Sequence, residues 1–198
     1  MNQNNTSLDP LELALLKDAE ILPRKHEVQD KLEKLLAQTG EQLLAQSLAL
    51  PWPSMPPKLS RGENYAQQAY RVMDYPRMQQ GEGFLFYRTL VLWGHPIGIH
   101  LIVSDHFMER LVPFLLDRYQ DLNPAWQFAA HDNPWIWEAS AAGLVACSSM
   151  AKEQLAGEIA KRKFLKLSRF FPLDQYADLA EMSVDCFAEL HHQLLARV

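Results

Sequence analysis

Two apolar β-type segments joined by a tight connection constrain this chain more than any other feature. Residues 84–93 read FLFYRTLVLW and residues 97–103 read IGIHLIV, with Gly94-His95-Pro96 between them. The first segment is rich in aromatic and β-branched residues and is apolar on both faces, as a strand covered on both sides would be. The short connection makes the two segments antiparallel neighbours. A third strand is expected at YRVMDY, residues 70–75, ending at Pro76 and followed by a loop at 79–83. Together they predict an antiparallel meander over residues 70–103.

Leucines at helical spacing dominate the N-terminal quarter of the chain. Asp9-Pro10-Leu11-Glu12 has the pattern of a helix start, because Asp9 can accept hydrogen bonds from free amides and Glu12 lies three residues later. Pro23 either ends this helix or opens a second one. After a polar tail at 1–7, residues 9–49 therefore predict an antiparallel helical pair that buries its leucines on the rest of the protein or on a second copy. Thr39-Gly40 is a point at which the second helix could break.

The remaining segments complete a single domain of 198 residues. A proline-rich strap is expected at 50–57, where LPWPSMPP cannot be helical. A mainly β region follows over 58–147, with one helix near 105–119 that Pro113 should kink or divide. A hairpin is expected about 126–147, between 126–130 and 135–139, with a short third run at 144–147. Helices fill 148–198, and the basic residues from Lys161 onwards lie where cations complement a helix C-terminus. The order helices, sheet, helices predicts an α+β fold with an antiparallel sheet flanked by terminal helices.

Composition and charge exclude several classes of protein. The net charge of −5 and pI near 5.8 disfavour binding to nucleic acid and to anionic membranes. Cys147 and Cys186 are too few for a disulfide framework or a zinc ligand set, which favours a reducing compartment. The segment MNQNNTS lacks the basic and apolar parts of a signal peptide, and no apolar run approaches the roughly 18 residues of a membrane span. We therefore expect a cytoplasmic protein with no membrane partner.

Charged residues inside β-type segments mark where a site would be. Asp74 and Arg88 lie in strands that should be adjacent, and a charge in a covered strand must be paired or it costs several kcal/mol. An Asp74–Arg88 pair could be purely structural or could hold a small anionic ligand. Glu63, Asn64 and Tyr65 are expected in a loop before the first strand, where they are either turn residues or ligand contacts. With His100, which points to one face of its strand, these six residues are the candidate site.

No motif in the chain specifies a cofactor, a metal or a reaction. His95, His100, His106 and His131 could join a carboxylate in a metal site, but their spacing matches no known metal-binding signature, so we predict no metal. Phosphate-binding glycine loops and the nucleophile motif of serine hydrolases do not occur, and no cofactor is predicted. Trp126, Trp135 and Trp137 could line a pocket for an apolar ligand.

The sequence leaves two hypotheses about function. The first is a non-catalytic binding protein for a small ligand or a partner, forming a homodimer through its leucine-rich helices. The alternative is an enzyme of unrecognised type, with a polar site on the central sheet made of Glu63, Asn64, Tyr65, Asp74, Arg88 and His100. The enzyme hypothesis requires these side chains to meet in one solvent-accessible cavity.

Overall fold

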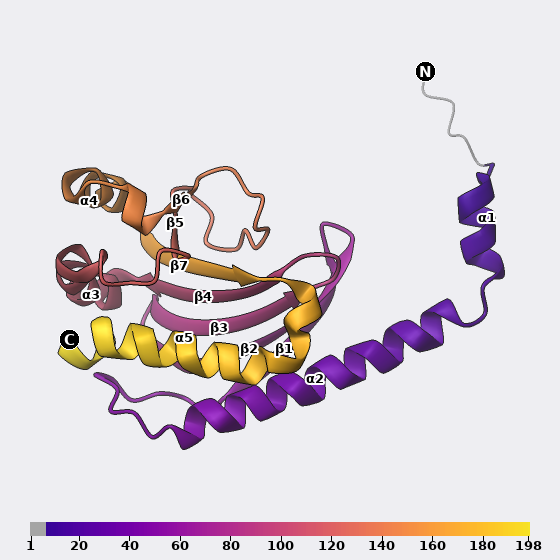
Figure 1. Cartoon of the computed structure of the whole chain (residues 1–198), viewed down its shortest axis with the longest axis horizontal. Helices are drawn as coiled ribbons and strands as arrows, with labels where there is room; N and C mark the ends of the chain where they lie inside the picture. The colour runs from indigo at the N-terminus through magenta and orange to yellow at the C-terminus, as the bar shows by residue number, and fades with distance from the viewer. Residues whose placement is uncertain (1–6) are drawn as a thin grey trace.

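A seven-stranded antiparallel sheet forms the centre of the protein (Figure 1). The computed structural model describes residues 7–198, so most of the predicted N-terminal tail lies outside the described residues. The strand order is β1-β2-β3-β4-β7-β5-β6. The strands are β1 (Lys58–Tyr65), β2 (Gln68–Gln80), β3 (Gly83–Leu92), β4 (Ile97–Ser104), β5 (Gln127–Ala129), β6 (Leu144–Ala146) and β7 (Phe164–Phe171). The predicted meander is confirmed as β2–β3–β4, and the α+β class is confirmed with it.

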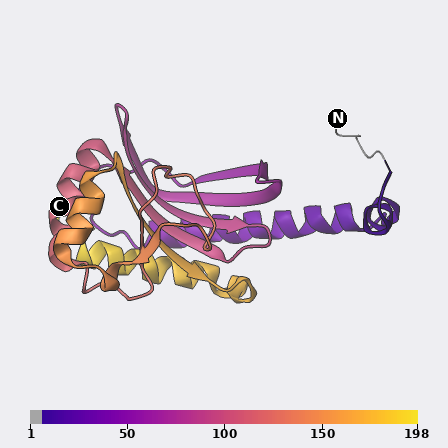
Figure 2. The same ribbon diagram turned by 90° about the horizontal axis from the view of Figure 1, so that it is seen from above.

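Helices cover one face of the sheet and one of its ends. The helices are α1 (Pro10–Lys17), α2 (Ile21–Ala45), α3 (Asp105–Arg118), α4 (Lys152–Ala160) and α5 (Leu179–Gln193), with short 3-10 turns η1 (Cys147–Ser149), η2 (Leu173–Asp178) and η3 (Leu195–Arg197). The C-terminal half of α2 lies beside α5 across one face, and α3 and α4 stand together at one end (Figure 1). Seen from above, α1 and the first turns of α2 extend well beyond the sheet (Figure 2).

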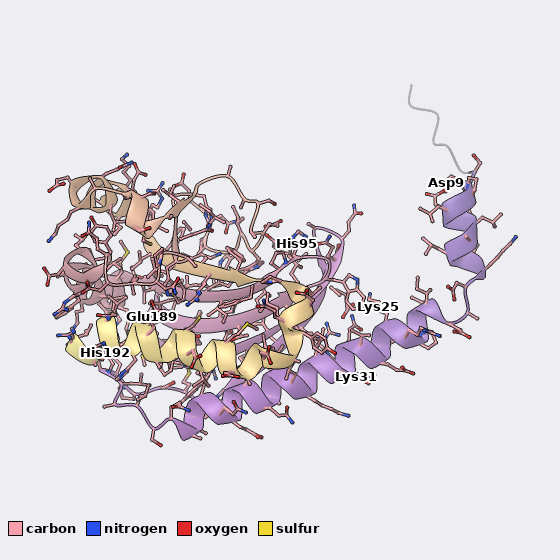
Figure 3. All side chains as sticks on the ribbon, viewed as in Figure 1. Asp9, Lys25, Lys31, His95, Glu189 and His192 are labelled. Carbon is pink, nitrogen blue, oxygen red and sulfur yellow. The ribbon has the colours of Figure 1, made fainter. Side chains whose placement is uncertain are left out.

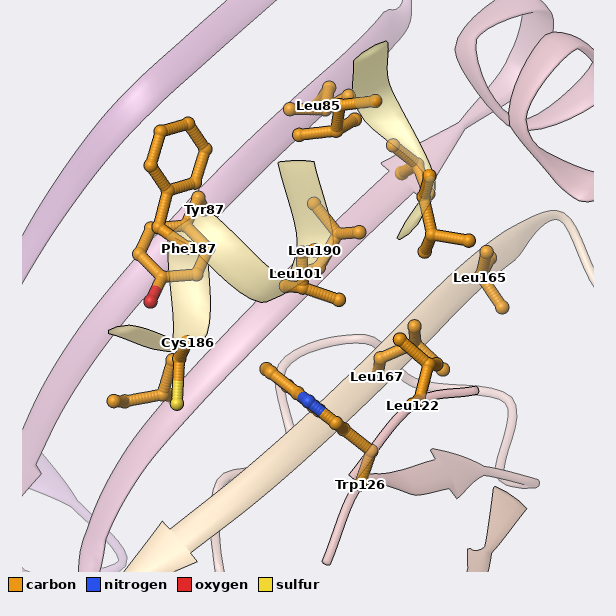
Figure 4. Packing of buried hydrophobic residues seen from close by; sticks show 14 of the residues in the cluster. Leu85, Tyr87, Leu101, Leu122, Trp126, Leu165, Leu167, Cys186, Phe187 and Leu190 are labelled. Atoms are coloured by element: carbon orange, nitrogen blue, oxygen red, sulfur yellow. The ribbon is translucent and has the colours of Figure 1, made fainter. Parts of the chain in front are cut away.

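Alternation along the strands gives the sheet two different faces. Toward α2 and α5, Leu85, Tyr87 and Leu101 pack against Phe187 and Leu190 of α5 in the main core (Figure 4). The opposite face carries a smaller apolar cluster, covered by a loop at residues 130–143. Its buried members are Val72, Leu90, Leu92, Ile102 and Trp137. The helices therefore cover one face, and the loop covers part of the other.

Several predictions about strands were wrong. Residues 62–65 are not a loop but the end of β1, and the chain turns at Ala66-Gln67, both with positive φ, where we expected no turn. Gly62 lies under the Tyr70 ring, and a Cβ there would lie 2.3 Å from the ring, so a larger residue in β1 would displace that side chain. The second strand continues through Pro76, since an irregularity between Asp74 and Arg77 interrupts the ladder at the proline. The loop expected at 79–83 is only a two-residue turn.

The second β region also differs from the expectation. Residues 135–139 form no strand; instead β5 pairs with β6 on one side and with β7 on the other. Strand β7 was missed, because residues 164–171 were included among the C-terminal helices. Its sequence FLKLSRFF alternates, so that Leu165 and Leu167 face the helices while Lys166 and Ser168 face the loop.

The N-terminal helices confirm the helix starts but not the packing. Asp9 caps α1 in a capping box with Glu12, as predicted. Pro23 lies in the first turn of α2, and this helix continues unbroken through Thr39-Gly40, where Gly40 allows the close approach of Pro57. However, α1 does not lie along α2, and none of its residues is buried (Figure 1). Likewise, α3 remains one helix despite Pro113. Among the described residues, no helix combines the length and apolarity that crossing a membrane needs.

Candidate functional site

A row of polar side chains crosses the loop-covered face of the sheet. The strand register places Asp74 opposite Arg88, Arg88 opposite His100, and His100 opposite Ser168. Arg88 donates two hydrogen bonds to the Asp74 carboxylate, with Nε–Oδ1 at 2.7 Å and Nη2–Oδ2 at 2.8 Å. His100 Nδ1 shares a hydrogen bond of 2.9 Å with Ser168 Oγ. The predicted Asp74–Arg88 pair is therefore confirmed, and three of the six candidate residues belong to this row.

The loop at 130–143 is held onto this row by Lys166 and by aromatic rings. Lys166, which is buried, donates hydrogen bonds to the carbonyls of Pro134 (3.1 Å) and Ile136. Its ammonium group lies 4.2 Å from the centroid of the Trp137 ring, and the Arg88 guanidinium lies 4.8 Å from the same centroid. These contacts fix the backbone and the indole of the loop against the sheet.

Tyr65 joins the same network from the far edge of the sheet. Its hydroxyl donates to Glu138 Oε2 at 2.7 Å and accepts a hydrogen bond from the Trp137 amide. Burial and the neighbouring Glu138 carboxylate raise the pKa of Tyr65 to about 12. Tyr65 therefore stays protonated at neutral pH and acts as a fixed hydrogen-bond donor that fastens the loop.

Burial lowers the pKa of two nitrogen groups beside Arg88, those of Lys166 and His100. Burial, reinforced by the Arg88 guanidinium, lowers the pKa of Lys166 to about 7. Burial also holds the pKa of His100 well below its usual range, and Lys166 and Arg88 depress it further. His100 is neutral at pH 7, and its Nε2 faces the backbone of Gly98, where a Cβ would lie 2.5 Å away. The ring is thus packed against the strand, and its buried Nε2 has no hydrogen-bond partner among the described residues.

Two of the other candidate residues lie elsewhere. Glu63 forms a second network beneath α2, where its carboxylate accepts hydrogen bonds from Arg71 (2.9 Å) and Gln29 (3.1 Å). The hydrogen bond from Arg71 is the main reason that the pKa of Glu63 falls to about 2. Arg71 also pairs with Glu33 of α2 at 2.8 Å. This network fastens α2 to the sheet. Asn64 is exposed and belongs to neither network.

The polar row is therefore a buried network covered by the loop. Asp74, His100, Lys166 and Ser168 are each at most 5% exposed, and their main polar contacts are with one another, with Arg88 and with the loop. Among the described residues, no group of three or more histidine, cysteine or carboxylate side chains could hold a metal ion. This geometry fits the structural interpretation of the Asp74–Arg88 pair, and a role of the pair in holding a ligand stays a prediction.

The open surfaces lie on the other side of the molecule, along the N-terminal half of α2. The first is a groove of about 860 Å³ between α2, the β3–β4 turn and η2, which we name the Trp93 groove. Its apolar lining residues are Val28, Leu32, Leu35, Val91, Leu92, Trp93, Leu173, Tyr176 and Ala177. Lys31 and Lys34 of α2 also line it. This volume falls in the range of small-molecule sites, and the groove is predominantly apolar.

A second opening, which we name the arm cleft, separates α1 from the sheet. It measures about 850 Å³ and lies between α1, the first turns of α2 and the β1–β2 turn. Val28 and Trp93 line both openings, so the cleft and the groove form one continuous surface. Sequence reasoning missed this surface: Trp93 was assigned to a covered strand, and residues 173–177 were included among the C-terminal helices.

Comparisons with known proteins add no functional information. No family model matches the chain, and no curated protein and no solved structure is similar to it.

Proposed function

We propose that this chain is a non-catalytic binding protein that holds a helical segment of a partner in the Trp93 groove. The observation that carries the proposal is the distribution of exposed apolar side chains. Of the fourteen large apolar side chains that are exposed in the described residues, eleven lie between Leu8 and Val28 or line the groove. Concentrated apolar surface of this kind is typical of interaction sites.

The shape of the groove favours a helix over a compact small molecule. Its α2 wall is formed at Val28, Lys31, Leu32, Leu35 and Gln38, the spacing of one helix face. Eleven residues of helix extend about 15 Å, which is the length of two to three helical turns. A groove of this kind accepts an amphipathic helix through apolar residues at i, i+3 or i+4, and i+7. The lysines on its rim favour an acidic segment.

Other parts of the prediction remain proposals of the same kind. A homodimer through the leucine-rich helices is one form that such binding could take. Placement in a reducing, cytoplasmic compartment is supported by Cys147 and Cys186, which are both free thiols and buried. A partner other than nucleic acid is supported by the net charge of −5. The enzyme alternative would need the loop at 130–143 to open, because Lys166 and His100 are covered in this conformation.

The proposal is tested with a designed peptide and a pair of matched variants. The probe is a fluorescein-labelled acidic peptide of about twelve residues, with leucines at helical i, i+3, i+4 and i+7 positions. Val28→Glu places a charge at the point shared by the two openings, where the native side chain is 42% exposed. His26→Glu introduces the same charge on an exposed position of α2 that lines neither opening.

Fluorescence anisotropy then measures the affinity of the peptide for each protein. We expect saturable binding to the native chain and to His26→Glu. Binding to Val28→Glu should be at least roughly tenfold weaker, because the new carboxylate replaces apolar contact surface, neutralises the nearby Lys31 and repels the acidic peptide. Absence of saturable binding to the native chain at concentrations where light scattering shows it to be monomeric, or equal affinity for Val28→Glu, would refute the proposed groove.

A further inference from the structure

Helix α1 buries no side chain against the rest of the described chain. It has only eight residues, a capping box at Asp9, and no buried residue. Leu11 is 70% exposed and Leu16 is 73% exposed. Isolated helices shorter than about 12 to 15 residues are marginal in water, and most helical stability comes from packing an apolar face. A leucine-rich helix of this length is therefore completed by contact with another surface.

The chain cannot supply that surface from its own Trp93 groove. Only residues 18–20 separate α1 from α2. Were α1 folded back as a hairpin, its eight residues would extend about 12 Å along α2, to the neighbourhood of Val28. The groove begins at Val28 and continues to Gln38. An intramolecular hairpin would narrow the arm cleft but would leave most of the groove open, so any helix that fills the groove comes from outside the chain.

The chemistry of α1 matches the groove. Its apolar side chains include Leu11, Leu15 and Leu16, and the carboxylates of Asp9 and Glu12 lie at its N-terminal end. The groove presents an apolar floor with Lys31 and Lys34, for which no ion pair is found among the described residues. The 12 Å length of α1 fits within the 15 Å wall of the groove. The acidic N-terminal end of α1, whose last turn carries Lys17, is complementary in charge to the two lysines of the groove, and the helix matches the groove in length and polarity.

We infer that α1 of one copy occupies the Trp93 groove of a second copy, and that the exchange is reciprocal. The inference rests on the proposed function and names its partner as the same chain. Reciprocal exchange forms a closed two-fold dimer, because the helix of each copy meets the groove of the other. Helix α1, with Asp9 at its N-terminal end, extends away from the sheet, and Lys31 lies on the open part of α2 (Figure 3). Both surfaces are therefore accessible to a second chain.

The test is a disulfide between two differently altered chains. One chain carries Leu16→Cys on α1, and the other carries Tyr176→Cys in the groove and a tag that changes its mass. Tyr176 is 55% exposed, so the substitution leaves the core intact, and the native thiols of Cys147 and Cys186 are buried. The control mixture pairs Leu16→Cys with Glu153→Cys, an exposed position on α4 at the opposite end of the molecule (Figure 1).

We expect a dimer mass for the native chain by light scattering, and a mixed disulfide in the Leu16→Cys and Tyr176→Cys mixture that is absent from the control. The inference would be overturned if the native chain is a monomer. It would also be overturned if the native chain is a dimer but the Leu16→Cys and Tyr176→Cys mixture forms no mixed disulfide, whether or not the control mixture forms one. These outcomes are separate from the peptide test. If the native chain is monomeric and still binds the acidic peptide in the Trp93 groove, the proposed function stands and only the second copy as partner is refuted.

Discussion

Replacing Arg88 by methionine tests whether the polar row serves stability or chemistry. Arg88 holds the Asp74 carboxylate through two hydrogen bonds of 2.7 and 2.8 Å, and the two side chains are 13% and 7% exposed. Methionine keeps most of the length and apolar surface of arginine but removes both donors. Asp74 would be left as a buried carboxylate without its partner.

The expected loss of stability follows from the burial of the pair. Removing one partner of a buried ion pair costs about 3 to 5 kcal/mol, because the remaining charge is uncompensated. The small residual exposure of Arg88, and the lysine that the register places opposite Asp74 on β1, reduce the penalty. We therefore expect a loss of about 3 kcal/mol in the free energy of unfolding. For an m value of about 2 kcal/mol/M, the urea midpoint falls by about 1.5 M.

Urea unfolding followed by tryptophan fluorescence measures this change, with two matched proteins. Arg24→Met removes an exposed arginine whose pairing with Glu20 leaves both side chains 75% exposed, and should change stability by less than about 0.5 kcal/mol. Adding Asp74→Leu to Arg88→Met should restore most of the loss, because no charge is then left buried. If the urea midpoint of Arg88→Met equals that of the native protein, the row is not a structural network and the enzyme alternative gains support.

Three further results follow from the same structure. The pKa of Lys166 is about 7 in the folded chain and near 10.5 in the unfolded chain, so the unfolded chain binds more protons between these pH values. The free energy of unfolding of the native chain should therefore rise between pH 7 and pH 10.5 by up to about 4 kcal/mol more than that of Lys166→Met. Urea unfolding at several pH values measures the difference. Glu63, with a folded pKa of about 2, should contribute stability that is lost as pH falls from 4.5 toward 2, and Glu63→Gln should lack this loss in acid titrations followed by circular dichroism. Gly98→Ala should lower the free energy of unfolding by about 1 to 3 kcal/mol, since its Cβ would lie 2.5 Å from the buried His100 ring. Gly157→Ala, which has open space around it in α4, should instead raise the melting temperature.

The sequence predicted those parts of the fold whose partners are neighbours along the chain. Strands β3 and β4 were recognised because each is a long apolar run and the connection between them is short. The Asp74–Arg88 pair was predicted because β2 and β3 are consecutive strands joined by a two-residue turn. The Asp9 capping box was also recognised, because its hydrogen bonds all lie within four residues.

The parts that were missed depend on distant pairing. Strand β7 joins β4 and β5 from more than thirty residues away, and its alternation was obscured because Lys161 and Lys163 also suit the end of a helix. Without β7 there was no basis for placing Lys166 and Ser168 beside His100. The loop at 130–143 was read as half of a hairpin, because Trp135 and Trp137 have the alternation of a strand. In the structure this segment forms no strand, and its Trp137 ring packs against the face of the sheet.

The division of the candidate site has a simple geometric cause. Side chains alternate between the two faces of a strand, so Arg71 and Asp74, three residues apart on β2, point to opposite sides. Residues that are close in sequence were therefore separated into one network under α2 and another under the loop. Each network fastens a covering element to the sheet, and neither lines the Trp93 groove. Only Lys25, which pairs with Glu63, also lines the arm cleft. Because sites without shared contacts have nearly additive effects, substitutions in the groove should change binding without loosening either network. Stability and binding can thus be altered separately in this chain, which a site built into the polar row would not allow.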